Sequence, residues 1–199
     1  MNRTTLAIVA CLVTAAAHAQ PLYSNGSSNP AVPAIATATS SLSGTRAPAG
    51  FLYAETQGTT TDANAMAGFS LGSDVAGSAA FRLADDFAIS GDYGVRLNTV
   101  TIYAYVPGLA SATQSPFSSA TIRLWMGHPA DPTSWTVFGD DATNRLVRAT
   151  PTSMLRIFNT RPLPLGQPPD SQRRIWALDL DLGGYTYESG TYWLDVQVN

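Results

Sequence analysis

From Phe81 to its end, the chain alternates apolar and polar residues with a period of two, and clusters of turn-forming residues interrupt the alternation. Successive side chains of a β-strand point to opposite faces, so the pattern predicts half-buried strands. Long amphipathic helical patterns are missing from these runs, in which β-branched and aromatic residues dominate. The expected strands cover residues 81–89, 100–106, 120–126, 135–138, 145–150, 154–158, 175–182 and 191–198. About eight or nine short strands predict an all-β fold, an antiparallel β-sandwich of jelly-roll type.

The first nineteen residues, MNRTTLAIVACLVTAAAHA, have the layout of a secretory signal peptide. The apolar run 6–17 is too short to span a bilayer, and 17–19 read Ala-His-Ala, an A-x-A cleavage site. We therefore expect cleavage after Ala19 and a secreted protein, extracellular or periplasmic. A lipoprotein signal ending at Cys11 is the alternative, but it would leave an unusually short apolar core.

The rest of the chain divides into two parts by composition. Residues 20–50 are rich in Ser, Ala, Thr and Pro and have few large apolar side chains. Such a segment buries too little surface to offset its ordering entropy, so we expect a flexible lead-in. Residues 51–199 are long enough to form one β-sandwich domain with a sizeable core.

Composition excludes several chemistries. All 11 basic residues are arginine, which rules out Schiff-base and lysine general-base mechanisms. Cys11, the single cysteine, is lost with the leader, and His128 is then the one remaining histidine. A disulfide, a thiol nucleophile and a multi-histidine zinc site are therefore excluded in the mature chain. The net charge of −3 offers no footprint for nucleic acid, and we expect a protein that is not an enzyme and needs no cofactor.

Calcium is the one ion for which the sequence offers candidate ligands. Asp85 and Asp86 lie in the expected strand 81–89, where alternation puts Asp85 on the apolar face. An unpaired carboxylate there is costly, so we expect a bulge or hydrogen bonds, with calcium as the alternative. Asp140, Asp141 and Asn144 form a tight turn of oxygen ligands, which turn formation explains equally well.

Three segments resemble a group of uncharacterised secreted bacterial β-sandwich proteins that share ADDF, ATIRLW and GTYWL strands. The segments are FRLADDFAISGDYGVRLNTVTIYAYV, SPFSSATIRLWMGHPADPTSWTVFGD and SGTYWLDVQV, within residues 80–199. The resemblance implies an extracellular β-sandwich and supplies no catalytic residues. Members of the group often continue past the last strand, so a truncated C-terminus is one expectation for this chain.

Three of the expected strands, 100–106, 120–126 and 191–198, have aliphatic residues at one set of alternate positions and aromatic or polar residues at the other. We call this property the parity of a residue, because the two sets point to opposite faces of the strand. The second set includes the candidate ligand-binding residues Tyr103, Tyr105, Arg123, Trp125, Trp193 and Asp195, together with Gln197. If these strands are neighbours, the set forms a platform of flat rings and polar groups suited to stacking on a sugar or a partner protein. The alternatives are that loops cover this face, or that the aromatic residues serve cross-strand pairing.

The sequence thus supports three functions, in descending order. The first is a non-catalytic β-sandwich that binds a glycan or an extracellular protein through its aromatic face. The second is a structural cell-surface or matrix subunit that assembles with copies of itself. The third is a carboxylate-dependent hydrolase. The oligomeric state does not follow from the sequence.

Overall fold

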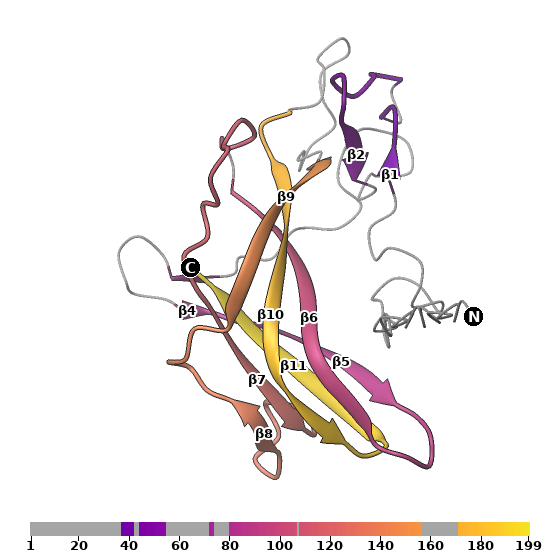
Figure 1. Cartoon of the computed structure of the whole chain (residues 1–199), viewed down its shortest axis with the longest axis vertical. Coiled ribbons are helices and arrows are strands. Elements are labelled where there is room, and N and C mark those ends of the chain that lie inside the picture. The colour runs from indigo at the N-terminus through magenta and orange to yellow at the C-terminus, as the bar shows by residue number, and fades with distance from the viewer. Residues whose placement is uncertain (1–36, 42–43, 55–71, 74–79, 107, 157–170) are drawn as a thin grey trace, which may run out of the picture.

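The computed structural model describes residues 37–41, 44–54, 72–73, 80–106, 108–156 and 171–199 (Figure 1). Across these residues the chain forms strands and no helix, and therefore no helix that could cross a membrane. The strands are β1 (Thr37–Ala38), β2 (Leu52–Ala54), β3 (Gly72–Ser73), β4 (Ala80–Phe81), β5 (Leu83–Ile89), β6 (Val95–Tyr105), β7 (Ala120–Met126), β8 (Trp135–Gly139), β9 (Leu146–Arg156), β10 (Arg174–Tyr187) and β11 (Gly190–Val198).

Nine of the strands form two facing sheets. One sheet has the order β1-β2-β9-β10-β6 and the other has the order β5-β11-β7-β8, while β3 and β4 pair separately. Every pairing within the two sheets is antiparallel except that of β2 with β9. In Figure 1, β10 crosses over β11, and buried side chains of both strands belong to one hydrophobic core, so the two sheets pack face to face. The predicted all-β antiparallel sandwich is confirmed.

Strand β9 differs most from the sequence prediction, because it is one strand rather than the two expected at 145–150 and 154–158. Pro151 lies inside it and pairs with Trp176 of β10. Proline has no N–H to donate, and it is tolerated here because the partner on the other side, β2, begins only opposite Met154. The register shifts next to this point, and the Thr152 hydroxyl donates to the carbonyl of Ile175 at 2.6 Å.

The core lies between the sheets and follows the predicted alternation. Trp176, Leu178 and Leu180 of β10 are fully buried, as are Ile122 and Leu124 of β7. Complete burial of each such side chain contributes roughly 1.5–3 kcal/mol. The polar residues between them must then face outward, which fixes the outer face of each sheet.

The last two strands carry the chain from one sheet to the other. Strand β10 ends at Tyr187 in the five-stranded sheet, and β11 begins at Gly190 in the four-stranded sheet. Strand β10 reaches this far because Gly183 and Gly184 adopt left-handed φ angles of 74° and 68° at a register shift. The Asp181 carboxylate accepts the N–H of Gly183 at 2.9 Å and stabilises this bulge.

Part of the predicted lead-in, residues 20–50, takes part in the five-stranded sheet. Strand β1 pairs with β2, with Ala38 opposite Tyr53. A small second cluster holds this region, in which Tyr53 and Leu155 are buried and Ala47 packs against them. Residues 20–36 and the predicted signal peptide lie outside the described residues.

Candidate functional site

Four of the six predicted ligand-binding residues come together on the outer face of the four-stranded sheet. Strand β11 lies between β5 and β7, and its register places Trp193 opposite Trp125 and Asp195 opposite Arg123. Residues directly opposite each other in an antiparallel pair project to the same face. The two tryptophans and this Asp–Arg pair are therefore neighbours, which is the arrangement expected for these two strands if they were adjacent.

The other two predicted residues, Tyr103 and Tyr105, lie elsewhere. They belong to β6, which pairs with β10 in the five-stranded sheet. Their neighbours Ile102 and Ala104 pack on the core, so the tyrosines face outward on the opposite side of the sandwich. The expectation that the three strands are neighbours is wrong for this strand. The physical reason is that parity determines which face of a strand is buried but not which sheet the strand joins.

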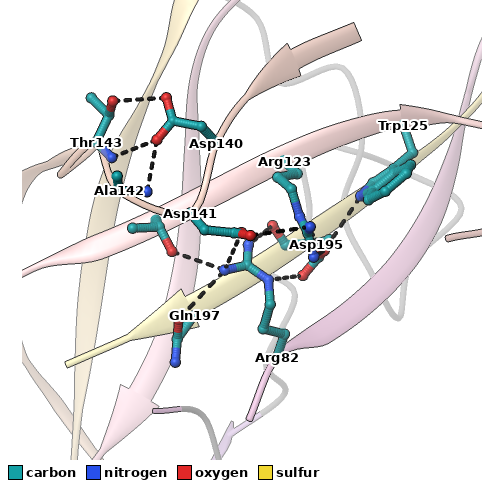
Figure 2. Close-up of polar contacts among 10 residues, drawn as sticks. Arg82, Arg123, Trp125, Asp140, Asp141, Ala142, Thr143, Asp195 and Gln197 are labelled. Atoms are coloured by element: carbon teal, nitrogen blue, oxygen red, sulfur yellow. Dashed lines mark hydrogen bonds and ion pairs between the residues drawn. The ribbon is translucent and has the colours of Figure 1, made fainter. Parts of the chain in front are cut away.

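Asp195 is the centre of a charged network on this face (Figure 2). Its side chain is buried, with 3% of the residue exposed. One carboxylate oxygen, Oδ1, accepts a hydrogen bond from Nε of Arg82 at 2.6 Å. The other, Oδ2, accepts bonds from Arg123 Nε at 2.9 Å and Nη2 at 2.7 Å. The indole Nε1 of Trp125 also donates to Oδ2, at 3.3 Å.

Two further groups complete the network. Arg82 also donates to the Thr121 hydroxyl at 2.9 Å and to the backbone carbonyl of Asp195 at 3.2 Å. Asp141 bridges both arginines, with Oδ1 at 3.1 Å from Arg82 and Oδ2 at 3.3 Å from Arg123. Two guanidinium groups and two carboxylates balance in formal charge, which offsets the cost of burying the Asp195 side chain.

Sequence reasoning missed Arg82 as part of this site. The residue lies between β4 and β5 and is followed by Leu83, which packs on the core. Because adjacent residues of an extended chain point to opposite faces, the position of Arg82 next to Leu83 indicates that its side chain faces outward. Its partner Asp195 is 113 residues further along the chain, and only the pairing of β5 with β11 brings the two together.

The two tryptophan rings are held by polar neighbours and are each only partly buried. The guanidinium carbon of Arg123 lies 4.9 Å from the centroid of the Trp125 ring, a cation–π contact. The ring of His128 meets Trp193 edge-on, with 4.4 Å between centroids and an interplanar angle of 71°. The pair thus combines flat apolar rings with fixed hydrogen-bonding groups.

The predicted calcium ligands in the turn after β8 already have protein donors. Asp140 Oδ1 accepts the N–H groups of Ala142 and Thr143 at 2.7 and 2.6 Å, and Oδ2 accepts the Thr143 hydroxyl at 2.7 Å (Figure 2). The bonds from Thr143, backbone first, and the N–H of Ala142 lower the pKa of Asp140 to about 2. Asn144 Oδ1 accepts the N–H groups of Ala120 and Leu146. These oxygens shape the turn.

Asp85 and Asp86 of β5 are both exposed. Asp85 has the parity of the core face, opposite Leu194, yet it reaches solvent because β5 is the edge strand of its sheet. Of the two arrangements expected for it, the structure shows a backbone hydrogen bond, from the N–H of Asp86 at 3.1 Å, and a register without a bulge. Within the described ranges, no three His, Cys, Asp or Glu side chains gather to hold a metal ion.

Comparisons of the chain with protein-family models, with curated proteins and with solved structures find no match. The protein is therefore classified by its fold and by the geometry of its site. It is a two-sheet β-sandwich whose four-stranded sheet carries a buried Asp–Arg network and a cross-strand tryptophan pair on its outer face.

Proposed function

We propose that this protein is a secreted, non-catalytic binding protein that holds a glycan against Trp125 and Trp193. The observation that carries the proposal is the direct cross-strand placement of these two rings on an outer sheet face. Aromatic rings stack on the apolar C–H faces of sugars, while polar groups beside them bind the hydroxyl groups. Secretion is the part of the proposal that rests on the leader sequence.

The surroundings of the tryptophan pair support a ligand longer than one sugar ring. Register places Asp86, Trp193, Trp125 and Thr136 in one row across β5, β11, β7 and β8. Neighbouring strands are roughly 4.8 Å apart, so the row measures about 14 Å. Exposed polar residues, Asp86 and Thr136, flank the rings at both ends. A short oligosaccharide lying across the strands would stack at the centre and form hydrogen bonds at its ends.

The chemistry of the face supports binding rather than catalysis. Asp195, the buried carboxylate of the network, already accepts hydrogen bonds from Arg82, Arg123 and Trp125. A general base or nucleophile needs a lone pair that is free to reach the substrate. The network is instead suited to fix the positions of Arg123 and Trp125 before a ligand arrives.

Trp193→Ala tests the proposal. A glycan array screened with the purified chain would identify a ligand, and titration calorimetry would then measure affinity. We expect Trp193→Ala to weaken binding by about tenfold, because each stacked ring contributes on the order of 1 kcal/mol beyond area burial. Trp135→Ala is the matched control. Trp135 is 58% exposed, but its partner on β7 is Met126, which packs on the core, so Trp135 does not lie on the face that carries Trp125 and Trp193. This variant should bind the glycan as the wild type does. Equal affinity of wild type and Trp193→Ala, or an array without any bound glycan, would contradict the proposal.

A further inference from the structure

Strand β6 forms one edge of the five-stranded sheet. It is 11 residues long and pairs with β10 along its length. No strand in the described part of the chain pairs with its other side. In an antiparallel pair, alternate residues direct their N–H and C=O groups away from the partner. About half of the backbone N–H and C=O groups of β6 therefore point away from β10, toward the free edge of the sheet.

The other sheet edges have features that discourage pairing. Strand β1 has two residues and β8 has five, which are too short to template a long ladder. Strand β5 carries exposed Asp85 and Asp86 at its middle. Charged side chains on an edge repel a second strand. Strand β6 has one charge, Arg96, and its Nε donates to the carbonyl of Gly184 in the same sheet at 2.8 Å.

The composition of β6 favours pairing. Residues 99–105 read TVTIYAY and contain no charge, glycine or proline. Six or seven residues of high β-propensity without charge or proline are typical of segments that pair between chains. Tyr103 is 37% exposed on the outer face of this segment, where it could cover a second strand.

We propose that β6 pairs antiparallel with β6 of a second copy, which joins the two five-stranded sheets into one. An antiparallel strand paired with itself obeys two-fold symmetry, the commonest symmetry of homodimers. The neutral segment 99–105 places no like charges opposite each other, although the whole chain has a net charge of −3. The inference is independent of the glycan proposal, because β6 and the tryptophan pair belong to different sheets.

Sedimentation velocity of the purified chain over a range of concentrations tests the inference. We expect a dimer that dissociates on dilution. Thr99→Lys should weaken the dimer by at least about tenfold, because it places a charge of each copy on the shared edge. Thr99 is exposed and so is Thr191, which lies on β11 between β5 and β7. Thr191→Lys is therefore the matched control and should leave the dimer unchanged, with both variants melting as the wild type does.

Cysteine cross-linking locates the contact. In a Cys11→Ser background, Thr99→Cys, Thr101→Cys and Tyr103→Cys would be oxidised singly and as mixtures of two variants, with Thr191→Cys as the control. At least one of these reactions should give a disulfide dimer, because an antiparallel strand paired with itself places two such positions, or two copies of one, directly opposite each other. The control should give none. A wild-type chain that stays monomeric at every concentration would overturn the inference, as would a dimer that Thr99→Lys leaves unchanged. Trp193→Ala should still dimerise, which separates this result from the glycan proposal.

Discussion

The carboxylate of Asp195 and the guanidinium of Arg123 form a two-bond pair, in which Nε and Nη2 both donate to Oδ2, at 2.9 and 2.7 Å. Arg82 binds the other oxygen, so Asp195→Asn would leave both arginines with a neutral group at the centre and with the more exposed Asp141 as their shared carboxylate. Removing one partner of a buried ion pair typically costs about 3 kcal/mol or more. We expect a loss of that size in the free energy of unfolding, measured by urea denaturation.

Arg148→Ala provides the control for this prediction. Arg148 also pairs with a carboxylate, that of Asp179, but its side chain is 71% exposed. Exposed ion pairs contribute roughly 0–1 kcal/mol, so this variant should remain close to the wild type. If Asp195→Asn and Arg148→Ala had equal small effects, the network would not stabilise the four-stranded sheet.

The two tryptophans of the proposed binding face should differ in their effect on stability. Trp125→Phe keeps an aromatic ring but removes the indole N–H that donates to Asp195. A hydrogen bond to a charged group contributes about 1.5–3 kcal/mol, so thermal or urea unfolding should show a loss in that range. Trp193 makes no hydrogen bond in the contacts described for this face, and its ring meets His128 edge-on. Trp193→Phe should therefore unfold within about 1 kcal/mol of the wild type.

The sequence pattern predicted which side of each strand is buried, because alternation with a period of two follows directly from strand geometry. It placed Trp125, Trp193, Arg123 and Asp195 on outward positions, and the structure has them there. The same pattern joined Tyr103 to this set, although it lies on the other sheet. Parity carries no information on strand order, which depends on where each connection crosses between the sheets.

Local turn chemistry was also visible in the sequence, whereas long-range partners were not. Asp140 stands before Ala142 and Thr143, and its side chain caps their N–H groups as turn-forming aspartates do. Asp141 follows it, but its contacts with Arg82 and Arg123 depend on strands distant in sequence. The same Asp and Asn residues in this turn are expected for calcium binding and for turn formation, so the sequence could not tell these two roles apart.

Gly139 allows a test of the β7–β8 pairing. Its φ is +82°, and a Cβ atom there would lie 2.1 Å from the carbonyl oxygen of Ile122. Gly139→Ala should therefore add a backbone clash to the cost of a left-handed φ. Left-handed strain costs about 1–2 kcal/mol, and forced overpacking adds roughly 1–3 kcal/mol. The measurement is the urea midpoint of the variant.

Gly91→Ala is the matched control for Gly139→Ala. Gly91 also has a positive φ, of +120°, but an added Cβ there would meet nothing within 4 Å. Gly91→Ala should therefore lower the urea midpoint only by the cost of the positive φ angle, without a clash. Similar losses for the two variants would mean that the close approach between Gly139 and Ile122 does not constrain the strand pair.

Protonation of the Asp140 carboxylate in acid should lower the stability of the protein. The N–H and hydroxyl of Thr143 lower the pKa of this carboxyl from its ordinary value of 3.8 to about 2. Between about pH 4 and pH 2, the unfolded chain therefore binds more protons at this site than the folded chain does. The stabilising contribution is complete above about pH 4 and is lost as the pH falls through 2. Carbon-detected NMR titration of the Asp140 side chain should give a midpoint near 2.

Asp140→Asn separates this contribution from the other carboxylates. The amide oxygen can still accept the N–H groups of Ala142 and Thr143, but it does not titrate. The variant should therefore lose stability less steeply than the wild type between about pH 4 and pH 2, as measured by urea denaturation at each pH. Asp131, whose pKa is lowered by the N–H and hydroxyl of Thr133, remains in both proteins as an internal reference. Identical slopes for the two proteins would show that the Asp140 turn does not contribute to acid sensitivity.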